Sequence, residues 1–198
     1  MRYHQNRGQA EGRLPSSPSM ILIEQAAATE EKRSESRKRE AALKMRGLRD
    51  FLSQAQAAVG LRGEVSVLLA SDRTLRTLNR NFRKKDKATD VLSFPVDDFH
   101  GDGTGQAGDL AISLDTAQRQ ADEHGHSLQI EVKILMLHGL LHLAGYDHET
   151  DDGQMARKES SLRKELDLPT GLIQRSRKIR RKSAKSASAG TKRRSRLR

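Results

Sequence analysis

Hydrophobic positions recur along the chain with two different periods, and the two periods predict different elements. Alternating or continuous apolar runs predict four short strands, at 20–24, 64–70, 91–96 and 109–113. Apolar positions three or four residues apart predict five helices, at 30–59, 73–82, 115–123, 127–143 and 151–166. Because strands and helices are mixed along the chain, we expect an α+β fold with one small mixed sheet flanked by helices.

Neither period is found at the two ends of the chain. Residues 1–19 are polar, and they lack the apolar core of a secretory signal. Their Arg, Ser and Pro residues leave an organelle transit peptide as the alternative to the cytoplasmic location that we expect. We predict a disordered extension at 1–19, one folded domain at 20–169 and a basic disordered tail at 170–198.

The net charge of +11 is concentrated in that tail. Residues 170–198 contain twelve Lys or Arg residues and no acidic residue, which leaves the rest of the chain nearly neutral. Such a run repels itself, stays unfolded and binds nucleic acid by releasing counterions from phosphates. A solvated tail with no specific partner is the alternative.

The sequence lacks both cysteine and a long apolar run, and each absence excludes some kinds of site or partner. The chain has no cysteine, so disulfides and thiolate metal sites are excluded, and any metal must be held by His, Asp or Glu. It has no run of about 18 apolar residues, so we expect no transmembrane helix and no membrane partner.

The sequence HGLLHLAGYDH, at 138–148, brings three histidines into one short segment. His138 and His142 share one face of the apolar helix, since positions i and i+4 lie about one turn apart. Gly145 favours the left-handed turn that ends a helix, and the reversed chain then returns His148 to the same point. Three neutral imidazoles leave a fourth position open, which is the pattern of a catalytic zinc site. We expect one zinc ion per chain; the alternative is three histidines that only pack or face solvent.

Position 139 separates this segment from the zinc proteases whose spacing it shares. In the HExxHxxGxxH proteases, a glutamate follows the first histidine and takes a proton from metal-bound water. Here the residue is Gly139, so proteolysis is disfavoured although the ligand spacing is kept. Zinc can still polarise an oxygen, and a phosphodiester suits a cation that works with an arginine. Asp147 is either an outer partner of the metal site or part of the turn.

A glycine pattern upstream imitates a nucleotide-binding motif. Gly103, Gly105 and Gly108 match G-x-G-x-x-G, which binds dinucleotides only where it opens a helix. The segment that follows, DLAIS at 109–113, is typical of a strand, so we interpret the glycines as a loop.

Three motifs together resemble the YbeY family: LNRNFRKKDKATDVLSFP at 78–95, GDLAIS at 108–113 and HGLLHLAGYDH at 138–148. The resemblance extends from about residue 20 to residue 168, so the first 19 residues and the basic tail are outside it. Members of this family are bacterial and organellar metal-dependent endoribonucleases associated with ribosomal RNA maturation. The resemblance implies an α+β fold with a three-histidine metal site at a helix end over the sheet.

The resemblance also implies roles for individual residues. His138, His142 and His148 match the family's zinc ligands. Arg83 matches an arginine that faces the metal and holds an RNA phosphate. Arg83 and His138 are therefore the catalytic candidates, and the general base is left open.

Further residues match the loop and strand beside the family's site. Thr89, Asp90 and Ser93 are, with Arg83, the substrate-binding candidates. Their alternative role is turn and strand-edge structure. Asp109 is either a carboxylate behind the metal site or a local cap.

The resulting hypothesis is a zinc-dependent endoribonuclease specific for single-stranded RNA, acting in ribosomal RNA maturation and in ribosome assembly and quality control. Its expected partners are single-stranded RNA, ribosomal RNA and the small ribosomal subunit. The alternative is a non-catalytic ribosome-assembly factor that binds RNA and uses zinc structurally. The oligomeric state stays open.

Overall fold

The computed structural model describes residues 19–24, 34, 38–39, 41–96, 105–148 and 150–169. Two disordered segments were predicted, at 1–19 and 170–198. Residues 1–18 and 170–198 lie outside the described residues. Within the described ranges, no helix is both long and apolar enough to cross a membrane.

Four strands form one mixed sheet in the order β1-β2-β4-β3. The strands are β1 (Met20–Ile23), β2 (Glu64–Ala70), β3 (Val91–Pro95) and β4 (Gln106–Ser113). Neighbours β1, β2 and β4 are parallel, and β3 runs antiparallel to β4. The predicted α+β class with a small mixed sheet is confirmed, and β3, which ends in a proline, is an edge strand as proline requires.

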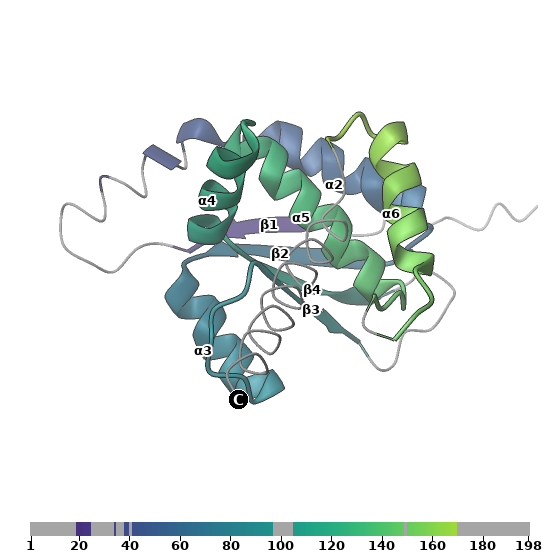
Figure 1. Cartoon of the computed structure of the whole chain (residues 1–198), viewed down its shortest axis with the longest axis horizontal. Helices are drawn as coiled ribbons and strands as arrows, with labels where there is room; N and C mark the ends of the chain where they lie inside the picture. Colours follow the sequence, from purple (N-terminus) through teal and green to yellow (C-terminus); the bar gives the residue numbers. More distant parts are fainter. Residues whose placement is uncertain are drawn as a thin grey trace, which may run out of the picture.

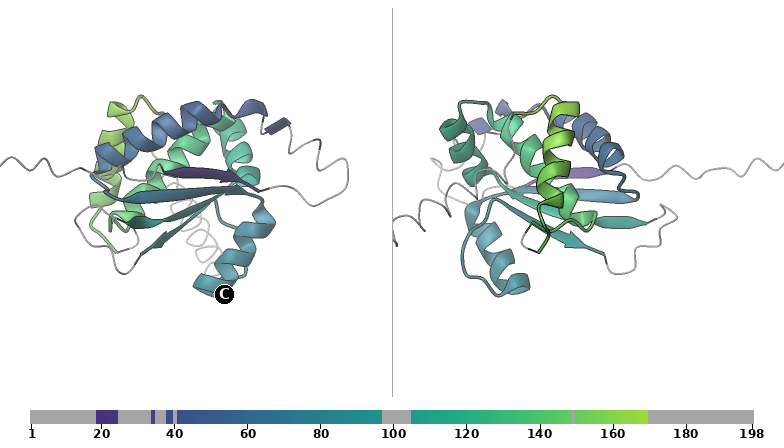
Figure 2. Two further views of the ribbon diagram at one scale, coloured as in Figure 1. Left: turned by 180° about the vertical axis from the view of Figure 1, so that it is seen from behind. Right: turned by 45° about the vertical axis from the view of Figure 1, so that its right-hand side comes forward.

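The helices cover the sheet unequally. They are α2 (Met45–Val59), α3 (Asp72–Arg83), α4 (Leu114–His124), α5 (Leu128–Leu143) and α6 (Gln154–Glu165). Helices α2, α4 and α5 lie over one face with α6 beside α5, whereas α3 lies against the opposite face (Figures 1 and 2). Serine side chains accept hydrogen bonds at the starts of three helices, from Thr74 N in α3, Thr116 N in α4 and Ile130 N in α5.

Side chains on β2, β3 and β4 alternate between two hydrophobic cores, whereas β1 contributes to only one of them. The larger core lies between the sheet and α5 and includes Val65, Val67 and Leu69 of β2. A smaller core of Ala70, Leu75, Leu92 and Ala111 lies under α3. The single-sheet architecture therefore separates a thickly covered face from a thinly covered one.

The prediction of one uninterrupted helix at 30–59 was wrong, because the described part of this segment contains a break. Residues 41–42 are helical, Leu43 and Lys44 are not, and α2 starts at Met45. Lys44 has an extended backbone, with φ −82° and ψ 91°, and Leu43 is buried while Ala41 is exposed. The break therefore turns Leu43 into the core, where uninterrupted helical spacing would have buried Ala41.

Strand β4 begins three residues earlier than predicted, so part of the expected glycine loop is strand. Gly108 has φ +149°, and a Cβ on it would lie 2.6 Å from the carbonyl oxygen of Phe94. Only glycine suits this close approach between β4 and β3. Because Gly105 immediately precedes β4 and Gly108 lies within it, these glycines do not open a helix, and the dinucleotide motif is excluded, as the sequence predicted.

Helix α6 begins three residues later than predicted. The carboxylate of Asp151 accepts hydrogen bonds from the backbone N–H of Gly153 (2.7 Å) and of Met155 (2.6 Å). Residues 151–153 therefore form the turn that precedes the helix.

Candidate metal centre

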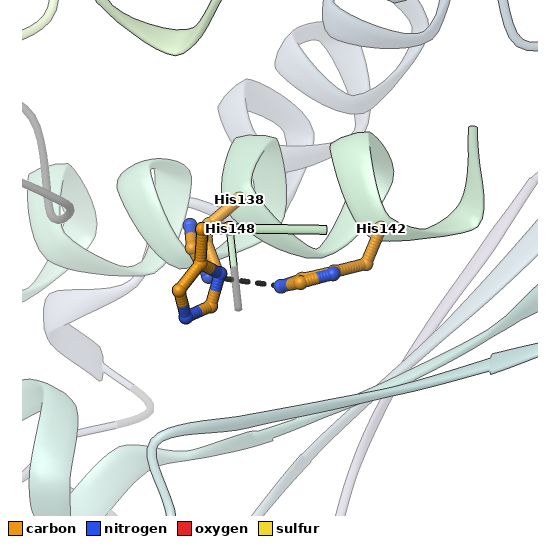
Figure 3. Close-up of side chains that lie close together, drawn as sticks. All are labelled: His138, His142 and His148. Atoms are coloured by element: carbon orange, nitrogen blue, oxygen red, sulfur yellow. Dashed lines mark hydrogen bonds between the residues drawn. The ribbon is translucent and has the colours of Figure 1, made fainter. Parts of the chain in front are cut away.

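Helix α5 and the turn after it bring three imidazoles together. One ring nitrogen from each of His138, His142 and His148 can be chosen so that all three lie within 4.8 Å of one another. The Nε2 atoms of His138 and His142 are 3.2 Å apart, and the three rings converge beside α5 (Figure 3). Gly145, with φ +86°, reverses the chain so that His148 returns to the helix. The predicted clustering of the three histidines is confirmed.

The environment of these rings suits a metal ion. Within the described part of the chain, Nδ1 of His148 is buried with no hydrogen-bond partner. Burial, and then the neighbouring His138 and His148, lower the pKa of His142 to about 4, against a smaller opposing effect of Asp147. At neutral pH the His142 imidazole is therefore neutral, which is the form that binds a metal. An orphaned nitrogen beside the neutral His142 ring, where three imidazoles converge, is what a three-histidine metal site presents before the ion binds.

A buried carboxylate that the sequence prediction missed contacts the first histidine of the cluster. Oε2 of Glu159, on α6, lies 3.2 Å from Nδ1 of His138, and Glu159 is 1% exposed. Its other oxygen lies 3.4 Å from Nη1 of buried Arg163. A carboxylate on Nδ1 fixes the ring orientation and keeps Nε2 facing the other histidines.

A signal for Glu159 was present in the sequence. It lies four residues after Met155 and three before Leu162, both buried, so it occupies a core-facing position of an amphipathic helix. An acidic residue at such a position is buried only with a partner.

Gly139 is required by packing. A Cβ at this position would lie 2.8 Å from Cδ2 of Leu110 and 3.3 Å from Cγ2 of Val91. The Gly139 carbonyl also accepts a hydrogen bond from Oγ of Ser93 at 3.2 Å. Helix α5 therefore meets β3 and β4 through Gly139, and a glutamate of the protease type has no room there.

Of the predicted substrate-binding residues, Ser93 contacts the helix that carries the histidines. Asp90 Oδ1 accepts hydrogen bonds from Val91 N (2.9 Å) and from the Thr89 hydroxyl (3.1 Å). Arg83 is the exposed last residue of α3. None of the contacts described for Arg83, Thr89 or Asp90 within the described residues reaches a histidine of the site.

The two remaining carboxylates take local roles. Oδ1 of Asp109 accepts a hydrogen bond from Nε2 of Gln106 at 2.6 Å. Oδ2 of Asp147 accepts one from the hydroxyl of Thr150 at 3.0 Å, and its carbonyl oxygen accepts one from Asp151 N. Asp147 thus belongs to the turn that carries His148, while its charge also acts on His142.

The fold and this cluster define a protein with a three-histidine site of the kind that could hold one metal ion. The family model described as Endoribonuclease YbeY matches residues 25–167, which include all three histidines. The chain belongs to this family.

Individual relatives agree with the family match. The chain is 56% identical over 137 residues to Endoribonuclease YbeY of Koribacter versatilis, covering 68% of this chain and 86% of that protein. It is 49% identical over 139 residues to Endoribonuclease YbeY of Solibacter usitatus, covering 70% of this chain and 90% of that protein. The shared region spans most of each relative, so the likeness concerns the whole folded domain.

Proposed function

We propose that this protein is a zinc-dependent endoribonuclease that cleaves single-stranded RNA and acts in ribosomal RNA maturation and small-subunit quality control. The observation that carries the proposal is the cluster of three imidazole donors, with the buried and unpartnered Nδ1 of His148 among them. Membership of the YbeY family supports RNA as the substrate. A cytoplasmic location and the ribosomal small subunit as partner are part of the proposal.

The donor set favours zinc. Three imidazoles with no thiolate suit Zn²⁺ better than Mg²⁺ or Ca²⁺, which prefer oxygen ligands. When bound, zinc supplies a Lewis acid that polarises a phosphate oxygen and lowers the pKa of water. His138, His142 and His148 would hold the ion, and Glu159 would fix the orientation of the His138 ring.

The proposed RNA-binding residues lie on and beside β3, the strand at one edge of the sheet. Arg83 would bind a phosphate, because a guanidinium presents two parallel donors to phosphate oxygens. Thr89, Asp90 and Ser93 would hold the protein backbone of the loop before β3, and of β3 itself, in the conformation that contacts the RNA. The hydrogen bond from Ser93 to Gly139 supports this role, because it connects β3 with the helix turn that carries His138.

Cleavage of a defined single-stranded RNA tests the proposal. The wild-type protein should cut the RNA, lose activity after treatment with a chelator and recover it when Zn²⁺ is returned. His142→Ala should not recover. A matched duplex RNA should be cut more slowly. If a zinc-loaded wild-type protein binds the RNA without cutting it, the chain is an assembly factor with a structural metal.

A further inference from the structure

Phe82 exposes an aromatic ring at the C-terminal end of α3. Its relative exposure is 66%, against 53% for Met20, 50% for Leu22 and 36% for Val96, the other exposed large hydrophobics among the described residues. The ring packs edge-on against Phe94 of β3, with centroids 5.2 Å apart and an interplanar angle of 70°. One side of Phe82 is therefore held by the sheet, and most of the ring meets solvent.

The residues around Phe82 are strongly basic. The segment RNFRKKDK, at 80–87, contains five Lys or Arg residues and one acidic residue, and all eight are exposed. The acidic residue, Asp86, accepts two hydrogen bonds from the guanidinium of Arg76, at 2.8 and 2.9 Å. We call this segment, with Phe82 at its centre, the α3 basic surface. Its charge suits a polyanion and disfavours an apolar protein partner.

The α3 basic surface lies across one edge strand from the metal centre. Ser93 of β3 bonds to Gly139 on α5, and the next residue, Phe94, points to the opposite face and contacts Phe82. Because β3 is an edge strand, a bound chain could pass from one face of the sheet to the other around β3 alone. Figure 1 shows α3 below this edge and α5 above it.

We propose that Phe82 is a stacking platform for a base of single-stranded RNA, with the basic residues beside it binding the flanking phosphates. Stacking on an aromatic face is available to every base, so the platform favours unpaired RNA without reading its sequence. RNA that reaches the histidines would cross the edge of β3 and rest on Phe82. This inference depends on the proposed function for its substrate class.

The chain contains no tryptophan, which allows a direct test. Phe82→Trp introduces the only indole of that variant at the platform, and Leu22→Trp introduces one at the opposite edge strand, β1. A short uridine oligonucleotide is added to each full-length protein by rapid mixing, and indole emission is read before cleavage proceeds. Base stacking should quench the emission of the Phe82→Trp variant, whereas the emission of the Leu22→Trp variant should not change. No quenching in the Phe82→Trp variant, or equal quenching in both variants, would overturn the proposal.

Two further variants separate stacking from simple apolar contact. Phe82→Ala and Phe82→Leu should both weaken binding of the oligonucleotide by roughly 5- to 150-fold, because neither keeps an aromatic face. Melting temperatures close to that of the wild type would show that both variants fold. Wild-type affinity in the leucine variant would indicate an apolar contact and defeat the stacking model. If the wild type cleaves RNA while the Phe82→Trp variant stays unquenched, only the platform fails; if the wild type neither binds nor cleaves RNA, the proposed function fails as well.

Discussion

Helices α5 and α3 lie on opposite faces of one sheet, and they differ in how much of each helix is buried and in how polar their residues are. Helix α5 buries twelve of its sixteen residues, including His138 and Glu131. Helix α3 buries two of its twelve, Leu75 and Asn79. Helix α5 is enclosed by the sheet, α2, α4 and α6 (Figure 2), whereas most residues of α3 are exposed.

This difference matches the two tasks of a metal-dependent nuclease. Ligands of a metal ion must be held in a fixed geometry, and burial beside packed helices restricts their rotamers. Residues that meet a flexible polyanion need exposure and charge more than rigidity. The proposed function places metal binding on the α5 face and RNA binding on the α3 face, and each of these two proposals can be tested separately.

The largest expected effect comes from removing the two proposed metal ligands on α5. The double variant His138→Ala/His142→Ala should lose metal affinity by more than about 100-fold, since even changes behind a ligand cost 10- to 100-fold. Elemental analysis of the purified protein measures this, with about one zinc expected per wild-type chain. His124→Ala, an exposed histidine on α4, is the matched control. Full zinc occupancy in the double variant would place the metal elsewhere.

On the α3 face, Arg83→Ala should lower the RNA cleavage rate by about 10²- to 10³-fold, a magnitude typical of losing one donor to a developing oxyanion. Zinc content and melting temperature should stay unchanged, because Arg83 is exposed. Single-turnover kinetics measure the rate. Arg73→Ala, exposed in the first turn of the same helix, should cleave nearly as fast as the wild type. Equal rates for the two variants would remove Arg83 from the site.

Glu159→Gln should weaken zinc binding by about 10- to 100-fold while leaving all three histidines in place. The change removes the negative charge that polarises the His138 ring through the 3.2 Å contact. Competition with a chromophoric chelator gives the affinity. Glu165→Gln, an exposed position on the same helix, should bind zinc as the wild type does. Unchanged affinity for Glu159→Gln would reduce the carboxylate to a packing role.

Gly139→Ala should destabilise the fold by about 1–3 kcal/mol, because the added methyl overpacks Leu110. Denaturant unfolding measures the loss. Gly47→Ala in α2 is the control: its Cβ would lie 3.1 Å from the flexible amide of Gln129, and alanine favours a helix over glycine by up to about 1 kcal/mol. If both variants are equally stable, the contact between α5 and the sheet is looser than the structure indicates.

Local patterns predicted most of the elements and the clustering of the three histidines well. Helices α3, α4 and α5 start and end within about a residue of the predicted positions, because capping serines precede amphipathic or apolar runs. The histidine cluster followed from i, i+4 spacing and a glycine turn, which are both short-range features. Helix ends and the histidine spacing each depend on residues that are close together in the sequence.

Features that depend on contacts between distant elements could not be predicted in the same way. Glu159 is 21 residues from His138, and only the packing of α6 beside α5 joins them. The need for Gly139 depends on where β4 places Leu110. The break at Leu43 depends on where the core lies, whereas the surrounding residues favour helix throughout.

The smallest expected effect concerns Asp72, which ties the two faces together. This first residue of α3 accepts hydrogen bonds from Ser113 at the end of β4 and from Thr116 and Arg119 of α4. Burial raises the pKa of Asp72, but these hydrogen bonds outweigh it and hold the pKa below the ordinary value of 3.8. Asp72→Asn should therefore lower the free energy of unfolding at neutral pH by about 1 kcal/mol.

The pH dependence gives this last prediction its sign. Because the pKa of Asp72 is lower in the folded state than in the unfolded state, its contribution is complete above about pH 4 and is lost as the pH falls through the folded-state value. The stability difference between wild type and Asp72→Asn should shrink over that range in urea unfolding. Asp86→Asn, which changes only the exposed pair with Arg76, should show a smaller difference at neutral pH. A constant difference down to about pH 2 would mean that Asp72 acts through the shape of its side chain and not through its charge, and that the two faces are joined by packing alone.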